Sequence, residues 1–247
     1  MTSTLKNKVA LVTGGSRGIG AAIVKKLAVE GVNVAFTYVH AQEKAQEVLA
    51  EIRALGRQGI AIQADSGNPK GIKEAVEQTV TELNQLDILV NNAGVFPAGS
   101  PEDVTLEELN RTLEVNVRGV FLASQAALKH LKAGGRIISI GSCFAHHVPK
   151  PGLSLYSMSK SALIGFTKGL ARDVGSRDIT VNVVDPGSTN TDMNPADSPN
   201  AEDKIKLLAL DYYGEGTDIA EMVAFLASER GRFITGANIA VDGGFGA

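Results

Sequence analysis

Short apolar runs alternate with longer amphipathic segments through nearly all of the 247 residues, and this alternation restricts the fold more than any other feature. Residues 8–12 are short and apolar, which is typical of a buried strand. Residues 42–55 have the apolar spacing of a helix and stop before Gly56. Strands that alternate with helices predict an α/β protein in which a doubly wound parallel sheet carries helices on both faces.

The same rhythm assigns the remaining segments. We expect strands over residues 8–12, 32–38, 59–64, 86–90, 136–140, 179–184 and 237–241. We expect helices over residues 19–30, 42–55, 69–84, 155–174 and 217–228, and one or two more within residues 101–132. The chain contains no repeat, low-complexity stretch or linker that would divide it, so we expect residues 1–247 to form one domain.

Residues 190–214 interrupt this rhythm. The segment carries Pro195 and Pro199, followed by an apolar, helix-like run over residues 205–210. A long irregular segment in an otherwise regular fold is often a lid or a substrate loop, and we expect that role here.

Composition excludes several classes of partner. The net charge is −3 and no long run of like charges occurs, so we expect neither nucleic acid nor an anionic membrane as a partner. Cys143 is the only cysteine, so no intrachain disulfide forms. Residues 1–8 are polar and the first apolar run is four residues long, which predicts no signal peptide and no membrane span. We expect a cytoplasmic protein.

A glycine-rich turn, T-G-G-S-R-G-I-G, follows the first strand and opens the first helix at residues 13–20. Glycines permit a tight turn and a close approach of the backbone to a pyrophosphate, and the helix N-terminus supplies free N–H groups. Gly14 and Gly18 are four residues apart, so the spacing differs from the usual G-x-G-x-x-G. An ordinary turn between strand and helix is the alternative. The position of the glycine-rich turn directly after the first strand favours a nucleotide site in a Rossmann-type domain.

The end of the second strand indicates which dinucleotide would bind. An NAD site generally has an acidic residue there to hold the ribose hydroxyls, whereas here no acid occurs before Glu43. Arg17 lies in the glycine turn and can pair with a 2′-phosphate, although a solvated turn residue is the alternative. The sequence therefore favours NADPH over NADH.

Tyr156 and Lys160 are four residues apart within a predicted helix, and Ser142 precedes the tyrosine by fourteen residues. Side chains at i and i+4 lie on one face of a helix. A nearby ammonium lowers the pKa of a phenol from about 10, which would make the tyrosine a proton shuttle. An exposed tyrosine stacked on a lysine stem is the alternative, and the choice depends on whether a redox cofactor binds.

These motifs together resemble the short-chain dehydrogenase/reductase family over nearly the whole chain. The resemblance covers T-G-x-x-x-G-x-G from Thr13, N-N-A-G at residues 91–94, Y-x-x-x-K at Tyr156, P-G at residues 186–187 and D-G-G at residues 242–244. It implies a single Rossmann-type domain, 1–247, that transfers a hydride. Met158 departs from the alanine common in the family, and the interval between Ser142 and Tyr156 is one residue longer than in many members.

The resemblance also implies roles for individual residues. Ser142 would hold the substrate carbonyl oxygen, Tyr156 would protonate it, and Lys160 would lower the tyrosine pKa and bind the ribose. Asn116 would anchor a water that connects Lys160 to solvent. The implied cofactor contacts are Gly14, Ser16, Arg17, Gly18, Ile19, Gly20, Tyr38, Asp65, Ser66, Asn92, Ala93, Gly94, Tyr156, Lys160, Pro186, Gly187, Thr189 and Thr191.

Several nearby residues invite other interpretations. Cys143 is interpreted as a packing residue and Ser139 as a buried strand residue rather than as nucleophiles. His146 and His147 are adjacent, so their side chains diverge, and no metal site is expected. Tyr212 and Tyr213 either line the substrate pocket or anchor the loop.

We therefore expect an NADPH-dependent reductase that acts on a small ketone or on a 3-oxoacyl carrier thioester. The alternative is a nucleotide-binding regulatory protein that sequesters a ligand with little turnover. The resemblance also implies a homotetramer formed through two long helices and the C-terminal strand, which the apolar stretch 162–170 favours.

Overall fold

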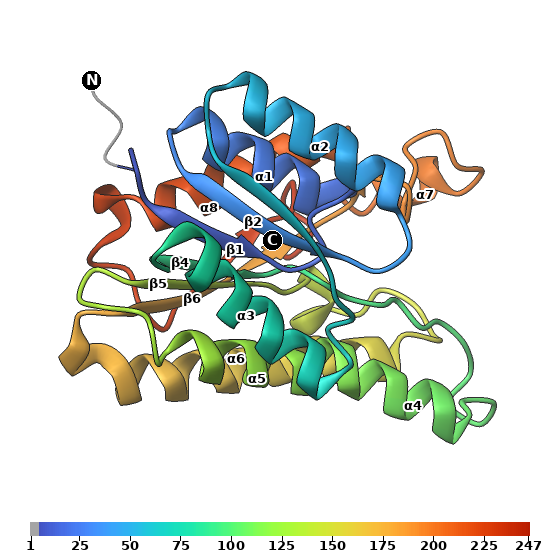
Figure 1. Cartoon of the computed structure of the whole chain (residues 1–247). Helices are drawn as coiled ribbons and strands as arrows, with labels where there is room; N and C mark the ends of the chain where they lie inside the picture. Colours follow the sequence, from blue (N-terminus) through green and yellow to red (C-terminus); the bar gives the residue numbers. More distant parts are fainter. Residues whose placement is uncertain (1–4) are drawn as a thin grey trace.

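The computed structural model describes residues 5–247, and a parallel sheet of seven strands runs through its centre (Figure 1). The strand order is β3-β2-β1-β4-β5-β6-β9. The strands are β1 (Val9–Val12), β2 (Asn33–Tyr38), β3 (Gly59–Gln63), β4 (Ile88–Asn91), β5 (Arg136–Ile140), β6 (Thr180–Pro186) and β9 (Asn238–Val241). Every predicted strand is confirmed. The chain changes direction across the sheet between β1 and β4, which is the switch point where such folds bind ligands. Residues 1–4 of the polar amino-terminal stretch lie outside the described residues.

Helices cover both faces of the sheet (Figure 1). The helices α1 (Gly18–Val29), α2 (Gln42–Ala54) and α8 (Gly216–Ala227) lie on one face, and α3 (Pro69–Leu83), α5 (Val120–Ala127) and α6 (Ser154–Val174) on the other. Alternate residues of β1 belong to two hydrophobic cores on opposite faces of the sheet. Ala10 and Val12 lie in the core beneath α1, α2 and α8, and Val9 and Leu11 lie in the core beneath α3, α5 and α6. The doubly wound α/β architecture is therefore confirmed.

The boundaries of α3 follow from its capping residues. The side chain of Asn68 accepts hydrogen bonds from the N–H groups of Lys70 and Gly71, and Pro69 occupies the first turn. Asn84 ends the helix in the left-handed conformation with φ of 65°.

Within the region 101–132, residues 106–127 form one continuous helical run with a wider turn in its middle. Helix α4 (Leu106–Leu113) begins at a capping box made by Thr105 and Glu108. A π turn, η1 (Glu114–Gly119), joins it to α5. Such turns are frequent at functional sites, and this one carries Asn116.

The irregular segment differs from the prediction in its helix. Helix α7 (Ala201–Ile205) ends where the apolar run 205–210 begins, so the predicted placement of this helix is wrong. The N–H of Leu210 instead donates to the carbonyl of Gly243, which draws the run against the C-terminal residues. Two short strands, β7 (Thr189–Asn190) and β8 (Gly214–Glu215), pair with each other and close the base of the segment.

Within residues 5–247, no helix is both long enough and apolar enough to cross a membrane.

Candidate active site

The glycine turn is tied to the end of β4 by a buried hydrogen-bond network. The hydroxyl of Thr13 accepts the N–H groups of Asn92 and Ala93, each at 3.0 Å. The side chain of Asn92 donates in return to the carbonyls of Thr13 and Gly14, each at 2.9 Å. The two predicted cofactor motifs thus form one rigid unit at the switch point.

Three glycines of the turn are required for different reasons. Gly14 and Gly18 have φ of 67° and 53°, which an L side chain rarely adopts. A Cβ on Gly20 would collide with the carbonyl of Gly14 and would lie 2.5 Å from Nδ2 of Asn92. The spacing of the motif therefore fits this turn, in which the backbone is left open for a ligand.

The region where a 2′-phosphate would lie carries two cations and one carboxylate. Arg17 is exposed and precedes α1, and Tyr38 ends β2 with its side chain buried. Lys44 of α2 pairs with Asp192 of the irregular segment at 2.6 Å. This hydrogen bond, with a further contribution from the charge of Arg17, holds the pKa of Asp192 below its usual value.

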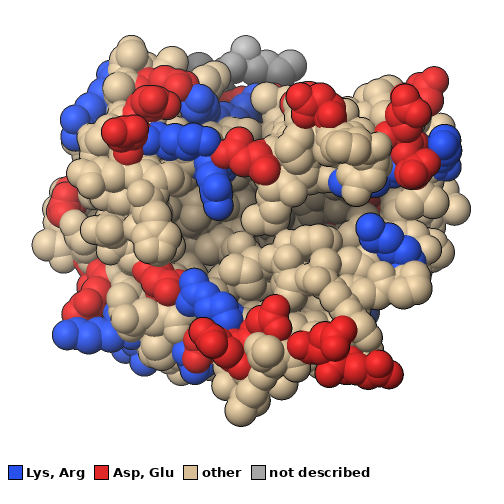
Figure 2. Space-filling view, turned by 90° about the vertical axis from the view of Figure 1, so that its right-hand side faces the viewer, with Lys and Arg blue, Asp and Glu red and all other residues tan. Residues whose placement is uncertain are grey.

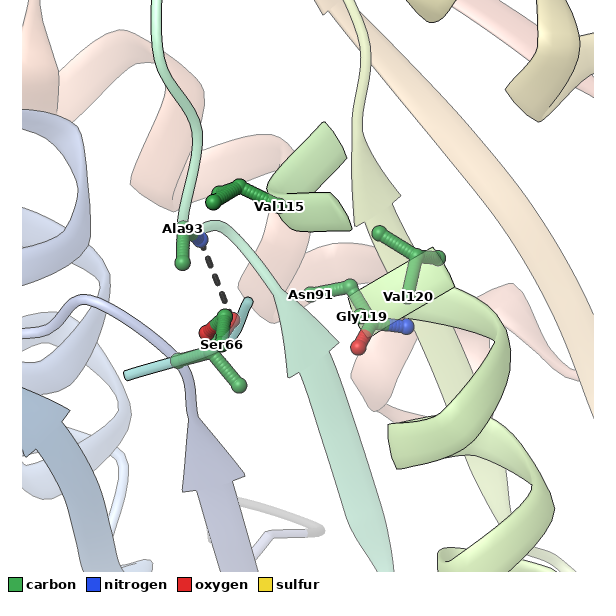
Figure 3. A pocket seen from close by; sticks show the side chains of 7 residues that line it. Ser66, Asn91, Ala93, Val115, Gly119 and Val120 are labelled. Atoms are coloured by element: carbon green, nitrogen blue, oxygen red, sulfur yellow. Dashed lines mark hydrogen bonds between the residues drawn. The ribbon is translucent and has the colours of Figure 1, made fainter. Parts of the chain in front are cut away.

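Asp65 and Ser66 occupy the loop that follows β3. Burial opposes ionisation of Asp65, but the bidentate pair with Arg111, at 2.8 and 3.0 Å, lowers its pKa. The hydroxyl of Ser66 is buried and has no hydrogen-bond partner among the described residues. It faces a small pocket beside the glycine turn (Figure 3), lined by Thr13, Ser66, Asn91, Ala93, Val115, Gly119 and Val120. Because Arg111 already engages the carboxylate of Asp65, the predicted cofactor contact of Asp65 stays a prediction.

Ser142, Tyr156 and Lys160 converge at the carboxyl end of β5. The side chain of Ser142 lies beside the phenol of Tyr156 and favours its ionised form. Lys160 Nζ lies 5.8 Å from the centroid of the tyrosine ring and donates to the carbonyl of Ile140 at 2.8 Å. The arrangement brings an alcohol, a phenol and a buried amine to one point.

The electrostatics of this group differ from the sequence-based expectation. Burial raises the pKa of Tyr156 to about 12, and the nearby side chain of Ser142 opposes that shift. Burial lowers the pKa of Lys160 to about 8, while the carboxylate of Asp185 opposes the shift. Lys160 makes no resolved contribution to the tyrosine pKa, because the amine is itself desolvated and bound to a carbonyl, and its predicted role toward Tyr156 stays a prediction. The phenol is protonated at neutral pH.

Asn116 joins the loop after β4 to helix α6. Its side chain donates to the carbonyl of Val95 and to the hydroxyl of Ser159, and it accepts the N–H of Val95. Gly94 lies beside it, and a Cβ there would stand 3.4 Å from Asn116 Oδ1 and 3.5 Å from Lys160 Nζ. The structure thus gathers Asn116, Gly94 and Lys160, whereas the water predicted at Asn116 stays a prediction.

The segment after β6 approaches the glycine turn from the other side. Gly187 donates to the carbonyl of Val241, and the hydroxyl of Thr189 donates to the carbonyl of Gly187. A Cβ on Gly18 would lie 3.4 Å from the side chain of Thr191. Thr191 therefore lies beside the glycine turn, and the predicted cofactor contacts of Pro186, Gly187, Thr189 and Thr191 stay predictions.

Aromatic side chains surround the phenol. The ring of Phe96 lies 4.6 Å from that of Tyr156, and the ring of Phe144 lies 6.3 Å from it. Phe245 packs on Phe144 at 5.6 Å and on His147 at 5.3 Å. Viewed toward the strand ends, the surface is hollowed in the middle, and the charged side chains stand mainly around the hollow (Figure 2).

The remaining candidates have simple surroundings. Cys143 is buried, which raises its pKa to about 12, and Ser139 is buried inside β5. Tyr212 is exposed, whereas Tyr213 is buried and its hydroxyl reaches Asn194 at 3.5 Å, so Tyr213 anchors the loop. Among residues 5–247, no group of His, Cys, Asp and Glu side chains is arranged to hold a metal ion.

The sequence-based interpretation missed Asp185, Gly141 and the pair of Lys44 with Asp192. Asp185 stands in a run of buried strand residues directly before Pro186, and an acid at such a position was the available signal. The pair of Lys44 with Asp192 joins residues 148 apart in the chain, and no local pattern indicates it.

Comparisons with known proteins agree with this fold. Residues 14–246 match the family model described as enoyl-(acyl carrier protein) reductase. A short-chain dehydrogenase from Burkholderia cenocepacia, crystallised with NADP, is 56% identical with a TM-score of 0.98, over 99% of this chain and 100% of that one.

Two relatives differ in the function that their names give. The cyclic-di-GMP-binding biofilm dispersal mediator protein of Escherichia coli is 40% identical over 97% of this chain and 98% of its own length. A 3-oxoacyl-[acyl-carrier-protein] reductase of Staphylococcus epidermidis is 40% identical over 96% of this chain and 98% of its own length. By sequence, fold and site, this chain is an oxidoreductase that belongs to the short-chain dehydrogenase/reductase family.

Proposed function

We propose that this protein binds NADPH and reduces a ketone or 3-oxo group to a secondary alcohol, with Tyr156 as the general acid. The observation that carries the proposal is the convergence of Ser142, Tyr156 and Lys160 at one strand end. The cofactor supplies a hydride to the carbonyl carbon, and the residues of the chain manage the proton.

The pKa of Tyr156 supports its role as the proton donor. With a pKa of about 12, the phenol holds its proton at neutral pH and can donate it to a carbonyl oxygen that gains negative charge. Ser142 holds that oxygen through its hydroxyl. Lys160, whose pKa of about 8 lies near neutrality, then returns a proton toward the phenolate.

The glycine turn fits a dinucleotide phosphate. Gly14, Gly18 and Gly20 leave no side chain over the N-terminus of α1, where free N–H groups attract an anion. Arg17 would pair with the 2′-phosphate of NADPH, and the solved Burkholderia relative contains NADP. The adenosine and pyrophosphate side would be completed by Ser16, Ile19, Tyr38, Asp65, Ser66, Asn92 and Ala93. The nicotinamide side would be completed by Pro186, Gly187, Thr189 and Thr191.

The aromatic side chains beside Tyr156 indicate which class of substrate would bind. Phe96 and Phe144 flank the phenol, and Phe96 is 41% exposed, so a flat or apolar carbonyl compound would find a matching surface. A 3-oxoacyl thioester is the other member of the proposal, as in the staphylococcal relative. Residues 190–214 would close over either substrate.

A nucleotide-binding regulator with little turnover is the second candidate. The Escherichia coli relative is named as a cyclic-di-GMP-binding protein, and this name favours the regulator. The complete set of Asn116, Ser142, Tyr156 and Lys160 favours chemistry, because a protein that only sequesters a ligand needs no proton donor.

One experiment separates the two candidates. Decay of NADPH absorbance is followed with a panel of aromatic ketones, aliphatic ketones and 3-oxo esters, while NADPH affinity is measured by calorimetry. Turnover of any class supports the reductase and ranks the substrates. Tight NADPH binding without turnover across the panel would favour the regulator.

We further propose a homotetramer in the cytoplasm. Phe121 on α5 is 51% exposed and Phe233 near the C-terminal strand is 99% exposed, which is costly for large apolar side chains in a monomer. Light scattering coupled to size-exclusion chromatography measures the mass, and a mass near 26 kDa would contradict the assembly.

A further inference from the structure

A buried carboxylate lies behind the candidate serine. Asp185 of β6 is 1% exposed, and its Oδ1 accepts the backbone N–H of Ser142 at 2.9 Å. Its Oδ2 lies 3.0 Å from Nε2 of His146 and 3.5 Å from the side-chain amide of Asn238. A carboxylate withdrawn from water needs such partners, so these contacts fix where the charge lies.

Gly141 makes the room for this carboxylate. The neighbouring strands β5 and β6 are in register up to Ile140 and Val184, and the N–H of Gly141 donates to the carbonyl of Val184. A Cβ on Gly141 would collide with Asp185 Oδ1. Gly141 has no left-handed φ, so space for the carboxylate, rather than backbone freedom, accounts for the glycine.

The carboxylate controls the backbone that presents the Ser142 hydroxyl. Ser142 begins a tight turn, η2 (Cys143–Ala145), and its hydroxyl accepts the N–H of Phe144 at 3.2 Å. The same hydroxyl reaches Tyr156. Because Asp185 holds the Ser142 N–H and His146 holds Asp185, both ends of this turn are attached to one buried group.

We propose that Asp185, supported by His146 and accommodated by Gly141, is a positioning residue that fixes Ser142 and sets the charge around Tyr156. The inference rests on the proposed reductase function. It assigns to Asp185 no contact with substrate or cofactor, only the placement of residues that make those contacts.

Several titratable groups lie near this carboxylate. Tyr156 and Lys160 face it from α6, and Cys143 and His146 face it from the turn η2. Asp242, after β9, adds a second negative charge near Cys143. The charge of Asp185 contributes to a higher pKa at Tyr156, Lys160 and Cys143, so its removal lowers all three.

The first test needs no turnover and uses the only cysteine as a reporter. Cys143 follows Ser142 and is buried, so its rate of modification by a thiol reagent measures opening of the turn. Asp185→Ala removes the acceptor, and we expect labelling at least about tenfold faster. Asp185→Asn keeps one acceptor oxygen, and we expect a rate within about fivefold of wild type.

Paired histidine variants provide the control. His146→Ala removes a contact with Asp185 and should accelerate labelling, whereas His147→Ala removes only a contact with Phe245 and should leave the rate near wild type. An Asp185→Ala rate equal to wild type, or equal acceleration by both histidine variants, overturns the assignment whether or not a ketone is reduced.

The second test separates positioning from general damage. With a ketone that the wild type reduces, Asp185→Ala should lower kcat by about 10- to 100-fold while the Kd for NADPH stays within about twofold. Asp185→Asn should retain most of kcat. The alkaline limb of its pH–activity profile should move to lower pH, because loss of the Asp185 charge lowers the pKa of Tyr156. Parallel losses in kcat and NADPH affinity, or an unchanged pH profile in Asp185→Asn, overturn the proposal. Absence of wild-type turnover would instead reject the reductase function and leave the labelling result standing.

Discussion

The cleft has two sides that are built differently. On the nucleotide side, the side chains of Thr13 and Asn92 join two adjacent loops through partly buried hydrogen bonds to the backbone, and three glycines keep that backbone bare. On the carbonyl side, side chains from separate loops meet around Tyr156, and the segment 190–214 is largely exposed. The nucleotide side is shaped by backbone, and the carbonyl side by side chains.

Because of this difference, the two sides should tolerate different substitutions. A backbone surface has no spare volume, so a single methyl group disturbs it. A side-chain surface can change its contacts residue by residue, so substrate choice can vary while the cofactor turn stays constant. The predictions below test this separation, from the largest expected effect to the smallest.

Loss of the phenol should affect chemistry alone. Tyr156→Phe removes the proton donor but keeps the ring that packs against Phe96, so we expect kcat to fall about 10²- to 10⁴-fold with the Kd for NADPH nearly unchanged. Steady-state kinetics and calorimetry measure the two quantities. Retained turnover would show that Tyr156 is not the proton donor. A parallel loss of NADPH affinity would show that the two sides of the cleft depend on each other.

A methyl group should lower stability when it is added on the nucleotide side and leave stability almost unchanged when it is added on the carbonyl side. Gly20→Ala places a Cβ against the carbonyl of Gly14, and we expect a loss of about 1–3 kcal/mol in the free energy of unfolding. Gly99→Ala on the carbonyl side meets no atom within 4 Å, and we expect a change within about 0.5 kcal/mol. Denaturant unfolding compares the two variants directly, and equal losses would refute the contrast.

Removal of Arg17 should change the choice of cofactor and leave the chemistry intact. Arg17→Ala removes a charged hydrogen bond of about 1.5–3 kcal/mol to a 2′-phosphate, so we expect the Kd for NADPH to rise about 10- to 100-fold. The Kd for NADH and the kcat at saturating NADPH should stay near wild type. Equal changes for both cofactors would place Arg17 away from the 2′-phosphate.

The same division explains what could be predicted from sequence. The strands follow from short apolar runs, and the glycine turn and Ser142 each lie just beyond the end of one. Tyr156 and Lys160 follow from their i, i+4 spacing on a helix. The tyrosine pKa could not be predicted, because it depends on burial and on Asp185, which is close only after β5 and β6 pair. The helix of the irregular segment was misplaced because the contact of Leu210 with Gly243 spans 33 residues.

One ion pair connects the two sides and provides the most delicate test of their separation. Asp192 of the irregular segment pairs with Lys44 of α2 at 2.6 Å, and both side chains are about half exposed. A bound 2′-phosphate would compete with this carboxylate for the charges of Lys44 and Arg17. Asp192→Asn should therefore tighten NADPH binding, but only by up to about fivefold, because an exposed pair contributes at most about 1 kcal/mol.

NADH lacks the 2′-phosphate, so its Kd should stay unchanged in Asp192→Asn, and the gain for NADPH should shrink as salt screens the charges. Asp197→Asn removes the same charge elsewhere in the segment and is the matched control. Calorimetry at low and high ionic strength measures these changes. Weaker binding of both cofactors would mean instead that the pair holds the segment over the cleft, and the two sides would then be mechanically linked rather than independent.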